Sequence, residues 1–289
     1  MYNDVTDMSH HYGIIMSTQT ASPYISQLFI YPIKSCAGIS VSILKFDHRG
    51  PRLDRNWMLV DASTGVFLSQ REVPRMALIS TTIECGRVWA GFGNDKKLME
   101  LPTEGRLIDV SIWEDEVQGL DCGDESARFF SEILDYQCRL IYQGRCERLA
   151  DTEYVSLGTQ VSYADGFPLL AVADSSIQFL DSVCDVDIAA ENFRPNIVIA
   201  NTEVFDERNW QSIATEVVDM TVVKPCQRCV IPALNPKTAE QERSILRVLL
   251  EYCRRDKKLY FGQNLTFSAV DSAMAVDVLE LHVGDDVVI

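Results

Sequence analysis

The chain has 289 residues, 47% of them hydrophobic, which is enough for two domains of ordinary size with buried cores. Its formal net charge of −16 repels nucleic acid phosphates and anionic lipid, so we expect neither nucleic acid nor membrane as a partner. No segment approaches the roughly 18 uninterrupted apolar residues that a membrane helix needs. Residues 1–24 lack the basic-then-apolar pattern of a secretory signal, which predicts a disordered leader on a cytoplasmic protein.

Short strand patterns dominate the first half of the chain. Runs of β-branched and aromatic residues, bounded by Gly, Pro and Asp, predict strands at Ile25–Ile33, Trp57–Asp61 and Met76–Ile83. After Asp124, which we expect to be an N-cap, the apolar period becomes that of a helix. A second helix is predicted after Asp174.

The second half of the chain mixes strands with one well-marked helix. Further strands are predicted at Asn196–Ala200, Val217–Val223, Ala275–Leu281 and Val287–Ile289. The turn at residues 284–286 between the last two predicts a hairpin-like end. Thr238 and Gln241 have the spacing of a capping box, and the apolar stripe that follows them predicts a helix.

Many short strands with a few helices among them predict an α+β chain that is mostly β and built on barrel-like sheets. Polar residues interrupt the pattern near Ile141–Asp151. We expect the boundary between an N-terminal domain at residues 25–145 and a second domain at residues 146–289 to lie there.

The chain has nine cysteines, and only Cys226 and Cys229 are closely spaced. The odd number and the scatter argue against a disulfide framework. A CxxC pair is compatible with zinc or iron–sulfur ligation, with a dithiol redox site, with a single thiolate that binds a soft metal, or with two inert buried thiols. No second CxxC or CxxH follows to complete a zinc site, and Arg228 favours a thiolate.

Basic residues recur where strands are expected to end. Lys34 with Ser35 could hold a phosphate, although a lysine in a loop is more often simply solvated. Arg55 adjoins a strand that should be buried, so it needs an anionic partner, either Asp54 or a ligand. Arg194 and Arg228 adjoin further strands. An anionic cofactor would account for all four cations in a chain that is otherwise acidic.

Several segments, in this order along the chain, resemble MOSC proteins of the type of the mitochondrial amidoxime reducing component and its bacterial counterparts. Those similar to the MOSC N-terminal β-barrel domain are Tyr-Pro-Ile-Lys-Ser at 31–35, Asp-Arg-x-Trp at 54–57 and Ser-Gln-Arg-Glu at 69–72. Those similar to the MOSC domain are Asn-Phe-Arg-Pro-Asn at 192–196, Lys-Pro-Cys-x-Arg-Cys at 224–229 and Phe-Gly-Gln-Asn at 261–264. The resemblance implies an N-terminal β-barrel-like domain packed with a MOSC β-barrel domain that carries a few helices.

The resemblance also implies a Mo-molybdopterin cofactor whose metal is held by one protein thiolate. The second cysteine of the motif, Cys229, takes that role and is the implied catalytic residue. The implied cofactor-binding residues are Lys34, Ser35, Arg55, Asp165, Gly166, Arg194, Asn196, Gln227, Arg228 and Asn264. A soft thiolate suits a redox-active metal, and the cations would neutralise the pterin phosphate.

Proteins of this type reduce N-hydroxylated compounds such as amidoximes and N-hydroxylated bases. The chain carries no cysteine-rich iron–sulfur segment, so we expect electrons from a separate protein: a ferredoxin, a flavoprotein or a b-type cytochrome system. The alternative is a non-catalytic carrier of molybdopterin or sulfur. The family is also associated with pyridoxal phosphate binding, to which the resemblance assigns no residue here.

Overall fold

The computed structural model describes residues 22–93 and 97–289. Residues 1–21, which make up most of the predicted leader, lie outside the described residues. Strands predominate, with a few helices among them, so the prediction of a mostly β, α+β chain is confirmed.

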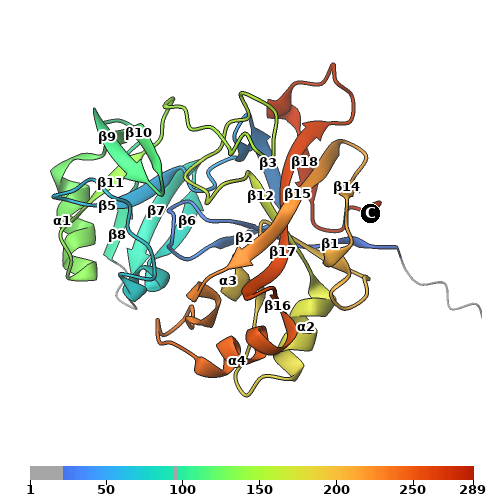
Figure 1. Ribbon diagram of the computed structural model, residues 1–289. Coiled ribbons are helices and arrows are strands. Elements are labelled where there is room, and N and C mark those ends of the chain that lie inside the picture. Colours follow the sequence, from blue (N-terminus) through green and yellow to red (C-terminus); the bar gives the residue numbers. More distant parts are fainter. Residues whose placement is uncertain (1–21, 94–96) are drawn as a thin grey trace, which may run out of the picture.

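The largest sheet forms the half of the molecule on the right of Figure 1 and has the strand order β14–β15–β17–β12–β13–β1–β2. Its strands are β1 (Tyr24–Ile30), β2 (Ile39–Val41), β12 (Leu169–Ala173), β13 (Ile197–Ala200), β14 (Ser212–Ala214), β15 (Val218–Arg228) and β17 (Lys258–Ala269), with β16 (Arg254–Arg255) paired to β17. β12 and β13 are parallel and the other neighbours antiparallel. β1 therefore joins the start of the chain to its C-terminal half.

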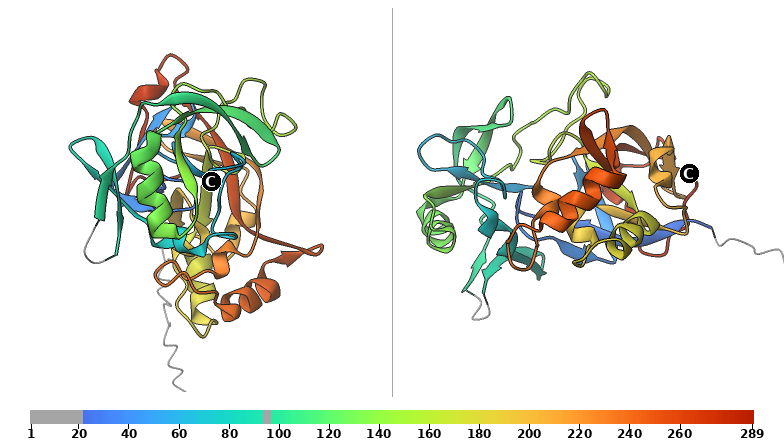
Figure 2. Two further views of the ribbon diagram at one scale, coloured as in Figure 1. Left: turned by 90° about the vertical axis from the view of Figure 1, so that its left-hand side faces the viewer. Right: turned by 60° about the horizontal axis from the view of Figure 1, so that its bottom comes forward.

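Alternate residues of this sheet enter two different cores. Ala171 and Ile197 face a core shared with strands from both ends of the chain, whereas Val172 and Val198 face the helices. The helices on that face are α2 (Asp174–Ser182), α3 (Ala190–Phe193) and α4 (Arg243–Tyr252). They lie together at the bottom of Figure 1 and come forward in the right-hand view of Figure 2. A sheet buried on both sides holds its strand ends rigidly.

Three smaller sheets complete the molecule. One has the order β5–β11–β10–β9, formed by β5 (Trp57–Asp61), β9 (Arg106–Ile112), β10 (Asp115–Asp121) and β11 (Cys138–Tyr142). The others are β6 (Ser80–Glu84), β7 (Arg87–Phe92) and β8 (Lys97–Glu100), and β18 (Glu280–His282), β3 (Ile43–Asp47) and β4 (Gly50–Pro51). Helix α1 (Gly123–Leu134) covers the first of these at the far left of Figure 1, where Phe130 and Leu140 share a core.

Several predicted elements are confirmed and others are shifted. The strand Trp57–Asp61 has the predicted bounds, and helices follow Cys122 and Ala173. The strand predicted at Met76–Ile83 is wrong in its first part. Pro74 starts a 3₁₀ helix, Pro74–Leu78, because proline presets a helical φ, and β6 begins only at Ser80.

Three predictions about the ends of elements are wrong. Asp124 lies inside α1, whose N-cap is Cys122. Thr238 lies in the loop before α4, where its hydroxyl accepts a hydrogen bond from the Glu240 amide, and the N-cap is Glu242. The closing hairpin does not form. β18 pairs with β3 and Val288 bridges to Ala214, because both find partners distant in sequence.

The remaining 3₁₀ helices are Asp206–Arg208, Ile231–Ala233 and Val276–Val278. Residues 143–168 cross from the smaller sheets to β12 and contain no named strand or helix. Because β1 pairs with β13 and β3 pairs with β18, the two halves share sheets. The boundary near residues 141–151 stays a prediction. Within residues 22–93 and 97–289, no helix has the length and apolar character needed to cross a membrane.

Candidate functional site

One pocket collects every residue singled out as a candidate from the sequence. It lies where loops of the N-terminal sheets meet the strand ends of the large sheet. The lining includes the predicted metal ligand and the predicted cofactor residues: Cys229 with Lys34, Ser35, Arg55, Asp165, Gly166, Arg194, Asn196, Gln227, Arg228 and Asn264. Five cations line it against a single carboxylate, that of Asp165. A chain of net charge −16 thus has a strongly basic pocket, as an anionic ligand requires.

Strand β15 delivers the two cysteines to this pocket. The strand is irregular, with register shifts against β17 between Val222 and Lys224 and again between Pro225 and Gln227. Such bulges re-aim side chains, which the sequence prediction of a strand ending at Val223 does not anticipate. Cys229 is the first residue beyond the strand, and its Sγ accepts a hydrogen bond from the Ile231 amide at 3.4 Å.

Cys226 differs from Cys229 in its contacts. Its Sγ accepts a hydrogen bond from Arg228 Nη1 at 3.1 Å. All nine cysteines of the chain are free. The described residues contain no group of three or more His, Cys, Asp or Glu side chains placed to hold a metal ion, so a four-ligand zinc site at the CxxC finds no support. A single thiolate ligand remains compatible with the geometry.

Two arginines that line the pocket each have a buried donor nitrogen that no protein group satisfies among the described residues. Arg194 Nη1 donates to the carbonyl of Cys36 at 2.7 Å, and Arg228 Nη2 donates to the carbonyl of Phe193 at 2.7 Å. Arg194 Nη2 and Arg228 Nε are buried, and neither has a hydrogen-bond partner among the described residues. Buried donors without partners are costly, so these two nitrogens fit a bound anion.

Arg194 is held next to other positive charge. Burial, and then the charge of Arg55, lower the pKa of Arg194 to about 10. The ring of Tyr31 contacts both guanidinium groups, with its centroid 4.3 Å from Arg194 Cζ and 4.4 Å from Arg55 Cζ. An anion between the arginines would offset their repulsion.

Arg55 already has a protein partner. Its Nη1 donates to Asp54 Oδ2 at 2.6 Å, and its Nη2 donates to the carbonyl of Arg194 at 3.2 Å. Of the two partners considered from the sequence, Asp54 is therefore the one present. Asn196 is similarly engaged, since its side chain donates to the Phe29 carbonyl and accepts from the Leu170 amide. Both residues fix the walls of the pocket.

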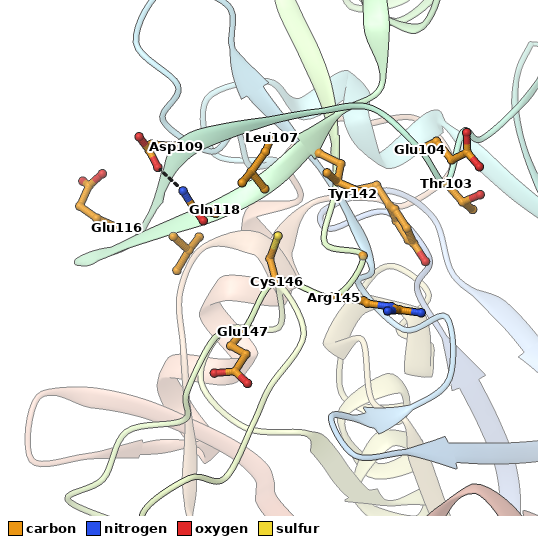
Figure 3. Close-up of a pocket in the computed structure, with 13 residues that line it drawn as sticks. Thr103, Glu104, Leu107, Asp109, Glu116, Gln118, Tyr142, Arg145, Cys146 and Glu147 are labelled. Carbon is orange, nitrogen blue, oxygen red and sulfur yellow. Dashed lines mark hydrogen bonds between the residues drawn. The ribbon is translucent and has the colours of Figure 1, made fainter.

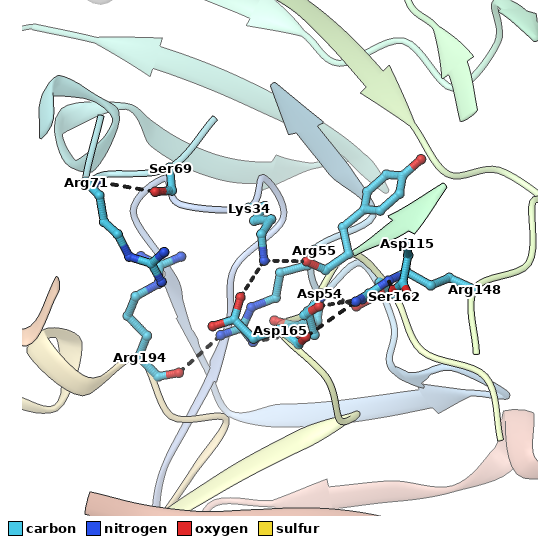
Figure 4. A network of polar contacts seen from close by, with 12 residues as sticks. Lys34, Asp54, Arg55, Ser69, Arg71, Asp115, Arg148, Ser162, Asp165 and Arg194 are labelled. Carbon is cyan, nitrogen blue, oxygen red and sulfur yellow. Dashed lines mark hydrogen bonds and ion pairs between the residues drawn. The ribbon is translucent and has the colours of Figure 1, made fainter. Parts of the chain in front are cut away.

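Lys34, another residue of the lining, is buried and donates from Nζ to Asp165 Oδ1 at 2.6 Å and to the Tyr163 carbonyl at 2.9 Å (Figure 4). Burial lowers the pKa of Lys34 to about 8, and Asp165 opposes that shift. Arg148, also buried, donates to the carbonyls of Ser162 and Ala164 and so holds the loop that carries Asp165.

Four non-glycine residues with a left-handed φ line the pocket, and eight more lie elsewhere in the described residues. The four are Ser35, Arg55, Trp113 and Arg194, with φ values of 65°, 51°, 56° and 57°. Non-glycine residues adopt this conformation at an energetic cost, and such residues cluster at binding sites. The strain is a further reason to place the functional site here.

The sequence does not predict two aromatic residues of the pocket, Phe67 and Trp113. Phe67 follows β5, and Trp113 lies in the turn between β9 and β10, a hairpin that no sequence signal marked. Their place in the pocket depends on tertiary packing alone. Ser69 and Arg71, part of the motif at 69–72, also line it.

A larger depression, of about 1330 Å³, lies along β9 and β10 (Figure 3). Its lining includes Glu104, Asp109, Glu116 and Glu147 around Cys146. None of the candidate site residues is among those that line it, and its acidic rim would repel an anionic cofactor. The larger volume of this depression therefore does not make it the candidate site.

Comparisons with known proteins identify the family of the chain. Residues 22–137 match the MOSC N-terminal β-barrel domain and residues 158–288 match the MOSC domain. The chain therefore belongs to the MOSC proteins and combines both domains of that family. The resemblance seen in the sequence motifs is confirmed.

Individual relatives indicate which MOSC proteins the chain is similar to. The chain is 32% identical to the mouse (Mus musculus) mitochondrial amidoxime-reducing component 1, over 83% of this chain and 74% of that protein. It is 30% identical to the rat (Rattus norvegicus) mitochondrial amidoxime reducing component 2, over 91% and 82%. It is 29% identical to a molybdenum cofactor sulfurase of Drosophila yakuba, over 80% of this chain but only 30% of the sulfurase. These similarities support a function related to the molybdenum cofactor.

Proposed function

We propose that the protein is a molybdenum-cofactor-dependent reductase of N-hydroxylated compounds, such as amidoximes and N-hydroxylated bases. The observation that carries the proposal concerns Arg194 Nη2 and Arg228 Nε, which are buried and have no hydrogen-bond partner among the described residues. The two arginines line the same basic pocket as Cys229. A cofactor that is anionic and carries a metal would use both the spare donors and the thiolate. Amidoxime-reducing relatives that match most of the chain agree with this choice.

In this proposal Cys229 holds the metal and Arg194 and Arg228 bind the anionic part of Mo-molybdopterin. The Ile231 amide, which donates to Cys229 Sγ, orients that sulfur. Ser35, Gly166, Gln227 and Asn264 complete the cofactor site. When bound, the cofactor supplies two-electron redox chemistry, and the protein supplies position and charge.

The remaining residues of the pocket act on its shape and protonation. Arg55 and Asn196 are engaged in protein contacts and act on the cofactor through the walls that they hold. Reduction of an N–OH group to N–H with loss of water consumes two electrons and two protons. Lys34 Nζ, with a pKa near 8, holds a proton at the pocket and is paired with Asp165.

Electrons come from a separate donor protein in this proposal, either a ferredoxin, a flavoprotein or a b-type cytochrome system. We assign no residue to pyridoxal phosphate. The proposed location is cytoplasmic, whereas the amidoxime-reducing relatives are mitochondrial by name.

Turnover tests the proposal. Holoprotein made in a host that synthesises the cofactor should reduce benzamidoxime to benzamidine with a chemical reductant, and Cys229→Ala should abolish this turnover. A holoprotein that carries stoichiometric molybdenum but reduces no N-hydroxylated compound would contradict it. That result would favour the alternative, a non-catalytic carrier of molybdopterin or sulfur.

A further inference from the structure

An aromatic surface borders the pocket beside Lys34, whose Nζ lies 5.4 Å and 5.6 Å from its two ring centroids. Neither aromatic residue belongs to a family motif. The surface consists of Phe67 and Trp113, whose ring centroids are 4.7 Å apart with the planes inclined by 55°. Both residues line the same pocket as Cys229. Trp113 is 40% exposed, so part of the residue is free to contact a ligand.

Trp113 is an unusual residue for its position. It begins the two-residue turn of the β9–β10 hairpin with a left-handed φ of 56°, where glycine or asparagine is favoured. A bulky residue there costs conformational energy, and the packing of the ring against Phe67 leaves 40% of the residue exposed. Residues with such a backbone cost cluster at binding sites, and Trp113 lines the pocket, so we place the ring among the ligand-binding groups.

The surrounding contacts hold this aromatic surface in place before any ligand binds. The Phe67 amide donates to the Ser111 carbonyl at 2.9 Å, which ties Phe67 to β9. At the hairpin turn, Asp115 Oδ2 accepts a hydrogen bond from Arg148 Nε at 2.9 Å (Figure 4). Arg148 also holds the loop that carries Asp165, so the aromatic surface and the Lys34–Asp165 pair are fixed relative to each other. A preformed surface binds its ligand at a lower entropic cost.

The chemistry of the ligand is indicated by Arg71. Its guanidinium carbon lies 4.8 Å from the Trp113 ring centroid, and the Arg71 side chain is exposed. A guanidinium is a planar, delocalised N–C–N group, and an amidoxime or amidine has the same N–C–N plane. An exposed arginine can be displaced from the ring, whereas the ring itself is held in place.

We propose that Trp113, supported by Phe67, stacks against the planar π system of the substrate and selects aryl or heteroaromatic N-hydroxylated amidines over aliphatic ones. This rests on the proposed function for the identity of the reaction, but the stacking itself is a property of binding. Aromatic stacking adds selectivity that scales with the planar area of the ligand.

The test compares benzamidoxime with acetamidoxime in wild-type holoprotein, Trp113→Phe and Trp113→Ala. Leu107→Ala is the matched control, because Leu107 is an exposed apolar residue of the same hairpin outside this pocket. Trp113→Ala should lower the ratio of kcat/KM for benzamidoxime to that for acetamidoxime by about three- to tenfold. Trp113→Phe should retain most of the ratio, and Leu107→Ala should leave it unchanged.

Calorimetric binding of the two amidoximes to the same holoproteins separates this proposal from the reductase function. If the wild type binds benzamidoxime more tightly and Trp113→Ala loses that preference, the aromatic surface is supported even without turnover. An unchanged ratio in Trp113→Ala, or an equal loss for both compounds, would overturn the proposal. Molybdenum content must be equal in all variants, which excludes loss of cofactor as the cause.

Discussion

The ion pair between Asp54 and Arg55 leads to a quantitative prediction about stability. The Asp54 side chain is 1% exposed and that of Arg55 12%, and their closest atoms are 2.6 Å apart. Asp54 also accepts the Tyr31 amide at 2.8 Å. Asp54→Asn keeps the shape but leaves Arg55 as a buried cation beside Arg194, so we expect a loss of roughly 3 kcal/mol.

Chemical denaturation of the cofactor-free protein measures this effect, with the pair Arg247–Asp185 as the control. That pair has nearly the same distance, 2.8 Å, but its side chains are 65% and 74% exposed. Asp185→Asn should therefore cost less than about 1 kcal/mol. If Asp54→Asn were as mild as Asp185→Asn, the buried cations would not depend on Asp54 and the reasoning about the pocket walls would be refuted.

Three further predictions concern other walls of the pocket. Burial lowers the pKa of Lys34 to about 8, so its buried charge lowers the stability below pH 8, and this cost is relieved as the pH rises from 8 to 10.5. The free energy of unfolding of wild type should therefore rise relative to that of Lys34→Met over this range. A constant difference between the two in urea titrations would contradict this. Arg148→Met should leave the carbonyls of Ser162 and Ala164 without their donor and lower the free energy of unfolding by about 2–4 kcal/mol. Amide hydrogen exchange around residue 164 should become faster, and normal protection there would show that Arg148 does not hold this loop. Gly38→Ala should weaken cofactor retention more than overall stability, because the added Cβ would lie within 2.7 Å of the Tyr31 ring, which contacts Arg55 and Arg194. Cofactor retention equal to that of wild type in a dialysis assay would show that the ring shifts freely.

The sequence predicts the strands and helices whose pattern is local. Trp57–Asp61 has the predicted bounds because its apolar run is buried on both faces. The wrong prediction of a closing hairpin concerns elements whose strand pairing is with residues far away in the sequence. β18 pairs with β3 at the other end of the chain, and no local signal could have replaced the predicted hairpin by that pairing.

For the candidate site, too, some features could be predicted from the sequence and others depend on the fold. Lys34, Arg194 and Cys229 are far apart in the sequence. The cations at strand ends suggested a shared anionic ligand, and the resemblance to MOSC proteins added Cys229 to the same site, which the pocket contains. That Arg55 is paired with Asp54 follows from the structure, since either Asp54 or a ligand satisfied the sequence argument. Trp113 was not predicted because its position depends on the β9–β10 turn and on the Arg148–Asp115 contact across the fold.

Molybdenum content in wild type, Cys229→Ala and Cys226→Ala tests the central claim most directly. The two cysteines lie three residues apart and line the same pocket, so each variant is a control for the other. We predict near-stoichiometric molybdenum in wild type, none in Cys229→Ala and largely retained metal in Cys226→Ala. Equal molybdenum in wild type and Cys229→Ala, or loss in Cys226→Ala alone, would contradict the assignment of Cys229 as the metal ligand.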